Sequence, residues 1–420
     1  MIGSWIRFVR ERHPIVYSVV WKVGTRVRMQ LSVAELLREL RSAEVSLPAL
    51  VTGWFAARFG SGRLTLSEFC IYNLHRLKAL SSRDRRAFVG DRGTAVLIEI
   101  LVDDYSKILN VDKVMCDHVA RAAGVPVPEI YALYAPRPRP GAFRNLTNAD
   151  ELRDFLTGWQ RFPIYCKPAC GDVAGIVPIG SGSHNFQIEG WADDHAVING
   201  DRSVSIAELA TRLTEPTGFG FLLMEALRSH DDIAEVAGDS VSGVRIHVLR
   251  MRSGPVIFRP VWKITRQGAV VDNFQHGRSG NLLASVDVRT GRVERVVGGT
   301  GRHQVVNPPH PDTGRELTGF QLPHWQALTQ VVLDGSELFP GFLCQGWDLA
   351  ICQDGPVLIE VNWFGNPDIS QLSYGRGFLE GQALDLLRER NLEPLLRGRY
   401  ARARRNSNAR FGRRKAHWPY

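Results

Sequence analysis

Lysine is scarce in this sequence, and several patterns that identify common protein classes are missing. Only seven of the 52 basic residues are lysines, and the six cysteines show neither C-x-x-C spacing nor a zinc-ligand spacing with histidine. No apolar stretch approaches the roughly 18 residues of a membrane-spanning helix, and the apolar run at 15–21 is too short for a signal peptide. The sequence therefore favours reduced cysteines and a cytoplasmic protein.

Basic charge is concentrated at the C-terminal end. The 420 residues are 44% hydrophobic with a net charge of +9, which excludes a disordered or disulfide-stapled protein. Residues 397–420 contain nine basic and no acidic residues, so the remaining 43 basic and 43 acidic residues balance. We assign 388–420 to a basic tail that binds polyanions weakly, and we expect no specific nucleic-acid partner.

The N-terminal quarter reads as helical. Apolar residues at three- and four-residue spacing predict helices within 31–40, 64–80 and 93–105, so we assign residues 1–105 to a helical N-terminal cap. The first 30 residues mix aromatic and basic side chains. They suit an amphipathic helix that either packs on the protein itself or touches an anionic membrane surface.

The rest of the chain reads as mixed structure. β-branched and apolar runs alternate with glycine and aspartate turns, and several of the connections are too short for a crossover between parallel strands. This pattern predicts an α+β fold with antiparallel hairpins. We divide it into segments 106–225 and 226–387.

Three oxygen-bearing side chains gather near the end of the second segment. Two predicted strands between 346 and 362 are joined by a three-residue loop at 353–355, a register that places Asp348 opposite Glu360. Asn362 shares the face of Glu360 because side chains alternate along a strand. Two carboxylates on an otherwise apolar sheet need a counter-charge, and oxygen ligands suit magnesium. The pattern favours a metal site; the alternative is a sheet rim whose acids face solvent.

A lysine followed by a glycine loop is the second candidate site. Lys167 ends a predicted strand, and the loop after it contains Gly171 and Gly175. Such a loop lets backbone N–H groups approach a phosphate while the ammonium supplies charge. The segment does not match the P-loop pattern G-x-x-x-x-G-K-[ST]. On its own it suits a surface lysine before a glycine turn equally well.

Three further segments place polar residues beside predicted strands. The strand that ends near Glu225 and Leu227 could present backbone groups to an adenine edge. Arg245 and Lys263 each lie in an apolar strand, so each is either an edge residue or a buried anion-binding group. The polar glycine loop at 272–280 could close over a reacting centre.

Read in order, these segments resemble the ATP-grasp superfamily, and most closely its sugar-transfer-associated branch, which is related to alpha-L-glutamate ligases. The resemblance runs from about Leu64 to Leu387 and includes the helix that follows Asp112. It implies two α+β subdomains that grip ATP. Segment 106–225 would hold the preceding region and the small subdomain, and 226–387 the C-terminal subdomain with the metal site.

The resemblance also implies roles for individual residues. Departures from the branch pattern at Gly277-Arg278 and near Gly243 bear on the acceptor pocket more than on the ATP site. The residues implied to bind nucleotide are Lys113, Lys167, Gly171, Gly175, Glu225, Leu227 and, for the ribose, Asp232. The residues implied to hold Mg²⁺, expected as two ions, are Asp348, Glu360 and Asn362. The residues implied at the reacting centre are Arg245, Lys263, Asp272 and Asn273.

The implied activity is the ATP- and Mg²⁺-dependent joining of a carboxylate to an amine through an acyl phosphate, in polysaccharide or glycoconjugate biosynthesis. Its partners would be small carboxylate and amine substrates, sugar-linked ones included, with peripheral membrane contact through the basic termini. The alternatives are phosphotransfer to a sugar hydroxyl and a non-catalytic scaffold of a glycan assembly complex. The sequence leaves the oligomeric state open.

Overall fold

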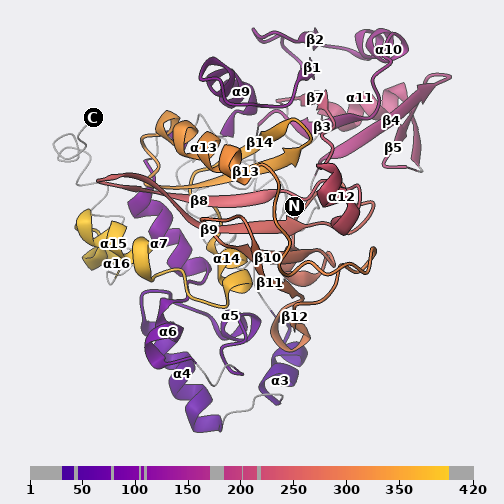
Figure 1. Cartoon of the computed structure of the whole chain (residues 1–420). Helices are drawn as coiled ribbons and strands as arrows, with labels where there is room; N and C mark the ends of the chain where they lie inside the picture. Colours follow the sequence, from indigo (N-terminus) through magenta and orange to yellow (C-terminus); the bar gives the residue numbers. More distant parts are fainter. Residues whose placement is uncertain are drawn as a thin grey trace, which may run out of the picture.

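The structure, a computed structural model, describes residues 31–41, 46–76, 80–103, 106–107, 111–170, 184–200, 202–214 and 219–396. Two seven-stranded sheets with helices on their faces, and a group of N-terminal helices, make up this part of the chain (Figure 1). The helices are α3 Val33–Arg41, α4 Leu47–Phe59, α5 Leu66–Ile71, α6 Ser82–Ala87, α7 Asp91–Leu101, α9 Lys113–Ala122, α10 Ala149–Thr157, α11 Ile206–Thr214, α12 Asp231–Ala237, α13 Trp325–Gly335, α14 Pro367–Tyr374, α15 Gly381–Glu389 and α16 Glu393–Leu396, with 3-10 turns η1 Gln275–Gly277, η2 Gly301–His303 and η3 Ser336–Leu338. The strands are β1 Ile130–Tyr134, β2 Arg144–Leu146, β3 Ile164–Pro168, β4 Phe186–Ala192, β5 His195–Ile198, β6 Arg202–Ser205, β7 Phe221–Glu225, β8 Val244–Met251, β9 Gly254–Ile264, β10 Leu282–Val286, β11 Val293–Gly298, β12 Val305–Val306, β13 Cys344–Cys352 and β14 Gly355–Asn362.

The first sheet forms a small lobe. Its strand order is β2-β1-β7-β3-β4-β5-β6, and its strands are antiparallel apart from the β1–β2 pair. Leucines of α10 and α11, including Leu152 and Leu209, pack with Ile164 and Leu223 to form its apolar core. The opposite face of the sheet, with Leu222 and Met224, is covered in part by Val114 of α9, so α9 links this lobe to the rest of the molecule.

The second sheet is antiparallel throughout and forms the larger lobe. Its order is β12-β11-β10-β9-β8-β13-β14. Because side chains alternate along a strand, its two faces differ. One face packs Val244, Trp262 and Trp347 into the largest apolar core of the described chain. The other face presents charged side chains toward the small lobe, and these form the candidate site.

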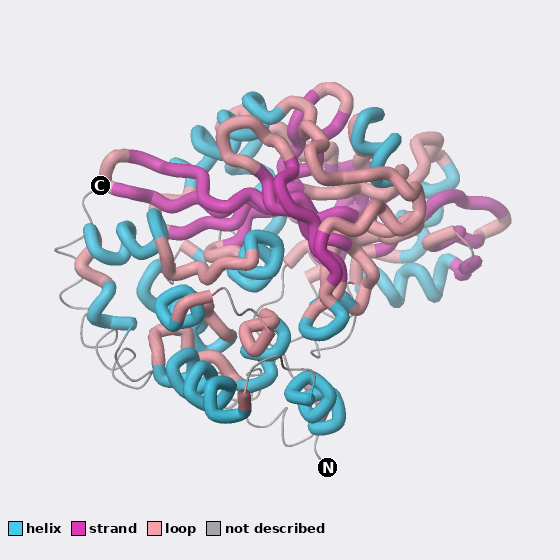
Figure 2. Tube along the Cα trace, turned by 60° about the horizontal axis from the view of Figure 1, so that its bottom comes forward, coloured by secondary structure: helices cyan, strands magenta, loops and turns pink. Residues whose placement is uncertain are grey.

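The N-terminal helices pack on the larger lobe. Apolar side chains of α5 form a cluster with Val261 and Leu283 of the second sheet and Leu372 of α14, and Val96 and Leu97 of α7 enter the main core. A buried amide joins the two parts: Gln371 accepts from the backbone N–H of Val89 at 2.7 Å and donates to its carbonyl at 2.9 Å. Figure 2 shows these helices gathered on one side of the sheet.

Most of the predicted elements are confirmed, and two expectations about the helical region are wrong. The strands predicted around Lys167, Arg245 and Lys263 form as β3, β8 and β9, and their neighbours are antiparallel as expected. The helix predicted over 64–80 covers only Leu66–Ile71, and α4 was not predicted. The apolar residues of α4 are distributed over all of its sides, so its sequence lacks the one-sided pattern that reveals an amphipathic helix.

Two expectations about the chemistry of the chain can be compared with the structure. All six cysteines are free, and four of them are buried. Within the described residues, no helix combines the length and apolar character that crossing a bilayer requires. The N-terminal 30 residues and the tail beyond Leu396, to which we attributed membrane and polyanion contacts, lie outside the described residues.

Candidate functional site

The β13–β14 hairpin positions the residues predicted to bind metal. Asp348 lies directly opposite Glu360, with Asn362 two residues further along β14. The turn is one residue shorter than predicted, because Cys352 pairs with Gly355, and a β-bulge beside Asp348 restores the register. The predicted pairing of the two carboxylates is therefore confirmed, although the three-residue loop that we used to derive it is wrong.

Asp348 is the centre of a buried ionic network. Its carboxylate binds Arg245 twice, with Nε–Oδ1 at 2.7 Å and Nη2–Oδ2 at 2.6 Å. Lys263 Nζ lies 2.9 Å from Oδ1, and Asn362 Nδ2 donates to Oδ2 at 3.0 Å. Burial raises the pKa of Asp348, but the Arg245 and Lys263 charges outweigh it and hold the pKa at about 2. Asp348 is therefore ionised at neutral pH.

Lys263 connects this network to the loop after β9. Its Nζ also lies 2.8 Å from Oδ2 of Asp272, and its side chain is almost fully buried. Burial lowers the pKa of Lys263, whereas Asp272 and Asp348 raise it, and the carboxylates prevail. Sequence alone left Arg245 and Lys263 as edge or buried residues, and the structure shows both buried and paired with acids.

Two lysines from the small-lobe side face Glu360. Lys113 Nζ lies 3.4 Å from Oε1 of Glu360, and Lys167 Nζ donates to the carbonyl of Ile359 at 3.3 Å. Burial and the nearby Lys113 charge lower the pKa of Lys167 to about 8, although Glu360 raises it. Glu360 forms an ion pair with Lys113, whereas Lys167 contacts a neutral carbonyl, so positive charge at this point favours an anionic ligand.

The N-terminus of α9 fixes the position of Lys113. The Asp112 side chain accepts hydrogen bonds from the backbone N–H groups of Val114 and Met115, a helix cap, and the Lys113 N–H donates to the carbonyl of Ala169 just beyond β3. Lys113 and Lys167 are thus held by adjacent backbone segments, although 54 positions of sequence separate them.

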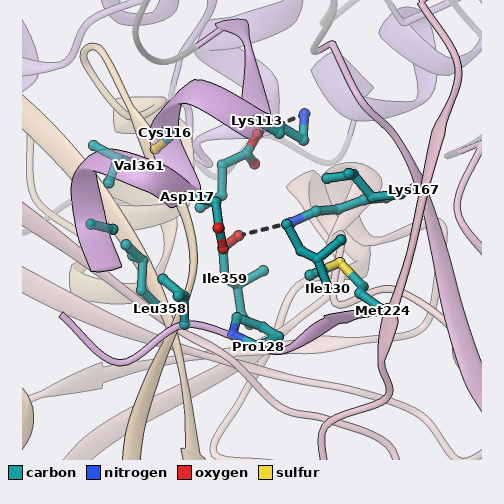
Figure 3. Close-up of a pocket in the computed structure, with 14 residues that line it drawn as sticks. Lys113, Cys116, Asp117, Pro128, Ile130, Lys167, Met224, Leu358, Ile359 and Val361 are labelled. Carbon is teal, nitrogen blue, oxygen red and sulfur yellow. Dashed lines mark hydrogen bonds and ion pairs between the residues drawn. The ribbon is translucent and has the colours of Figure 1, made fainter. Parts of the chain in front are cut away.

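A cavity lies between the two sheets at this point (Figure 3). Figure 3 shows Lys113 and Lys167 on one side of it, with Met224 and Leu358 among its apolar walls. Its lining residues are Lys113, Cys116, Asp117, Ala120, Val127, Pro128, Ile130, Lys167, Leu222, Met224, Leu358, Ile359, Glu360 and Val361. The lining combines apolar side chains with two ammonium groups, a chemistry that suits a ligand with both an apolar ring and anionic groups.

The predicted hinge adjoins this cavity without lining it. Glu225 is the last residue of β7, and its carboxylate accepts from the backbone N–H of Glu129 at 3.1 Å. Its neighbour Met224 lines the cavity, whereas Leu227 and Asp232 do not. Asp232 lies in the first turn of α12 with its side chain 67% exposed. Gly171 and Gly175 lie outside the described residues.

The loop that carries Asp272 and Asn273 is braced from inside. The buried side chain of Asn281 donates to the carbonyls of Val271 and Asn273 and accepts from the backbone N–H of Arg266. Phe274, 4% exposed, packs among residues of the N-terminal helices. The structure therefore shows this loop as a fixed wall beside Lys263, with Asn273 exposed.

Most of the chain matches the model of a known protein family. A model described as sugar-transfer associated ATP-grasp matches residues 98–384. The chain belongs to this family. The ATP-grasp α+β fold, with two sheets facing a shared cavity, is thereby confirmed. A comparison with curated proteins finds no match.

Solved ATP-grasp structures are similar only at a distance. N5-carboxyaminoimidazole synthase from Aspergillus clavatus, in complex with ADP and an aminoimidazole ribonucleotide, is 10% identical with a TM-score of 0.36, over 67% of this chain and 52% of that one. The L-amino acid ligase from Bacillus licheniformis is 11% identical with a TM-score of 0.34, over 64% and 43%. D-alanyl-alanine synthetase A from Vibrio cholerae is 12% identical with a TM-score of 0.38, over 71% and 68%. The chain thus spans about half the length of the first two, and no substrate is inferred from them.

The ATP-grasp family implies ATP and Mg²⁺, and the donor atoms at β13–β14 can be tested for fit. The two carboxylates and the Asn362 amide supply oxygen atoms, which suit a hard divalent cation. Both Asp348 oxygens already take two hydrogen-bond or ionic contacts each. Glu360, with a side chain 39% exposed, is the most accessible donor. The set fits Mg²⁺ in its donor chemistry: the Glu360 carboxylate is partly exposed, whereas the Asp348 carboxylate is held by Arg245, Lys263 and Asn362.

Sequence reasoning missed two groups of residues at this site. Cys116 and Asp117 line the cavity one helical turn after Lys113, and their three- and four-residue spacing from it on α9 would have placed them on its face. Asn281 was missed because it acts through backbone carbonyls ten and eight residues earlier. A lone asparagine before a strand gives no sequence signal of such a role.

Proposed function

We propose that this ATP-grasp protein is an ATP- and Mg²⁺-dependent ligase that joins a carboxylate to an amine. The observation that carries the proposal is the charge of the cleft. Four cations, Lys113, Lys167, Arg245 and Lys263, meet three carboxylates, Asp272, Asp348 and Glu360, at the face shared by the two lobes. A fourth carboxylate that lines the cavity, Asp117, pairs with Arg121 at 2.9 Å. The excess of positive charge suits a triphosphate that arrives with its metal.

Each cation would have a distinct task. Lys113 and Lys167, which line the cavity, would bind the nucleotide phosphates, while Met224 and Leu358 contact the base. We keep the backbone at Glu225–Leu227 as the adenine hinge, because it follows Met224 directly. Asp232, exposed on α12, is the weakest of the proposed contacts and would reach the ribose only at the edge of the site.

The chemistry follows from electrostatics. A carboxylate is a poor electrophile, so it is first phosphorylated: its oxygen attacks the γ-phosphorus of ATP, the bond to the β-phosphate oxygen breaks, and ADP leaves. Mg²⁺, held by Glu360, Asn362 and Asp348, would supply charge neutralisation at the phosphates. Arg245 and Lys263 would stabilise the negative charge of the transferring group.

The amine then attacks the acyl carbon and inorganic phosphate leaves. The amine must lose a proton, and Asp272 is the carboxylate nearest to Lys263, so we place it and Asn273 beside the acceptor. The fixed loop would orient the two substrates rather than close over them. The family description, sugar-transfer associated, suggests sugar acids or amino sugars as substrates in glycoconjugate synthesis.

The experiment is a product analysis with the purified chain, ATP and Mg²⁺. A panel of carboxylates and amines, sugar acids included, is tested singly and in pairs. We expect ADP and phosphate only when one carboxylate and one amine are both present. ADP released with a phosphorylated sugar and no amine would identify the phosphotransferase instead.

Nucleotide-binding measurements on variants distinguish a panel that lacks the true substrates from a proposal that is wrong. Calorimetry with ATP and Mg²⁺ should show binding by the wild-type chain and at least a tenfold loss in Lys113→Met, because a phosphate contact of this kind contributes about 1.5–3 kcal/mol. Asp194→Asn, which removes an exposed partner of Arg153 on the same lobe, should bind as the wild type does. No nucleotide binding by the wild-type chain would overturn the proposal and support the non-catalytic scaffold.

A further inference from the structure

Helix α4 exposes an apolar face. Val51, Phe55 and Phe59 are 40%, 48% and 76% exposed and lie four residues apart, so they line one side of the helix. Leu50 and Ala57 on its other side are buried. The other large exposed apolar residues of the described chain are spread over different elements, so α4 is where they gather. Figure 1 shows α4 at the end of the molecule farthest from the small lobe.

Positive charge surrounds this face. Helix α4 contains no acidic residue and has Arg58 in its last turn, with the guanidinium 5.9 Å from the centre of the Phe59 ring. The neighbouring helix α6 contains Arg83, Arg85 and Arg86 against a single acid, Asp84, which is used in capping the helix at Ser81. The rim of the apolar face is therefore cationic.

Both strongly basic ends of the chain are continuous with residues that contact the N-terminal helical region. Residues 1–30 contain six basic and one acidic residue, and the described chain resumes at Leu31, which packs in the same cluster as Trp54 of α4. Residues 397–420 leave from Leu396, whose carbonyl accepts from Arg63 Nη2 at 3.0 Å, just after α4. The charge of these ends together exceeds the net +9 of the chain.

We propose that the α4 face, defined as Val51, Phe55 and Phe59 with the arginines of α4 and α6, docks this protein on an anionic membrane surface. The three apolar side chains would enter the boundary between headgroups and acyl chains, while the arginines and the two basic ends contact lipid phosphates. One helix face with three apolar side chains is too small for a stable protein interface, which buries about 800 Å² per partner. It is sufficient for interfacial binding when basic segments add their attraction.

This proposal does not depend on the ligase reaction. The cavity is lined by residues of both sheets, whereas α4 lies at the end of the molecule farthest from the small lobe (Figure 1). Docking through α4 would therefore leave the cavity open to solvent. It would hold the enzyme at a membrane surface without occupying the site.

The test is flotation of the full chain with vesicles of phosphatidylcholine alone and with about 30% phosphatidylglycerol. We expect binding only to the anionic vesicles, weakened by salt because the attraction is partly electrostatic. The double variant Phe55→Ser/Phe59→Ser should lower the partition coefficient at least tenfold. Phe219→Ser, which changes a phenylalanine 50% exposed on the small lobe, should leave it unchanged. Equal binding by the double variant would overturn the proposal, because the basic ends alone would then suffice.

Hydrogen exchange over residues 47–59 decides which partner covers α4. We expect slower exchange in this segment only when anionic vesicles are added. Slow exchange without vesicles in a monomer would mean that residues 1–30 cover the face, and slow exchange in a dimer would mean a second copy does. Either result would overturn the membrane proposal. Unchanged thermal unfolding of the serine variants shows that they remain folded.

Discussion

The buried charge of Lys167 gives the sharpest prediction. Its native pKa of about 8, against 10.5 for an unperturbed lysine, means that keeping it charged at neutral pH costs the folded state about 3 kcal/mol. Lys167→Met removes this cost and also the hydrogen bond to the Ile359 carbonyl, worth about 1 kcal/mol. The variant should therefore be more stable than the wild-type chain by about 2 kcal/mol at pH 7, and should bind ATP more weakly.

The pH dependence has a definite sign. Below pH 8 Lys167 is charged in both the folded and unfolded states, so the wild-type chain bears the full cost. Between pH 8 and 10.5 the folded state loses the proton first, so wild-type stability rises relative to the variant. The gain of Lys167→Met should be largest below pH 8 and should disappear above about pH 10.5.

Urea denaturation at pH 7 and pH 10, followed by circular dichroism, measures this difference. Lys167→Arg serves as the control, since a guanidinium keeps its charge at both pH values and should give no gain. If Lys167→Met is less stable than the wild-type chain at pH 7, or if its gain is the same at both pH values, the argument from desolvation fails. A Lys167→Met variant that is more stable but binds ATP more weakly would show that Lys167 serves function and not stability.

Three further predictions follow from the same site. Asp348→Asn leaves two buried cations without their shared carboxylate and should lower the free energy of unfolding by about 3–5 kcal/mol in urea; a loss below about 1 kcal/mol would contradict the network. Asn281→Ala should speed hydrogen exchange at Arg266 and at residues 271–274 and leave exchange in α13 unchanged, because its amide bonds only to backbone groups of that segment. Gly346→Ala should destabilise the fold by more than 1 kcal/mol, since a Cβ there would lie 2.6 Å from the Cα of Gly365, and a neutral effect would show that the strand can shift.

Sequence predicted the local part of the site better than the long-range part. The Asp348–Glu360 pair could be predicted because both residues lie in one hairpin, although the predicted loop was one residue too long and the bulge beside Asp348 offset that error. The Arg245–Asp348 pair could not, because 103 positions separate these residues and the order of strands in the sheet decides their meeting. The sequence alone left two environments open for Arg245, an edge position and a buried anion-binding position.

The missed elements have similar physical reasons. The strands β4, β5 and β6 were also not predicted: β4 contains Gly190 and the exposed Glu189, and β5 and β6 have four residues each, so an alternating pattern is hard to see. Helix α4 is apolar on all sides, which hides its helical period. Its exposed phenylalanines could be identified only once the structure showed which side is covered.

The packing of α7 has a consequence for how this protein can be divided. The family match begins at residue 98, inside a helix that starts at Asp91 and inserts Val96 and Leu97 into the main core. The segment that matches the family model is therefore shorter than the segment whose side chains form the main core. A fragment cut at residue 98 would lack Val96 and Leu97 and would expose the apolar residues that they cover, so we expect it to fold less stably than one that begins before α7.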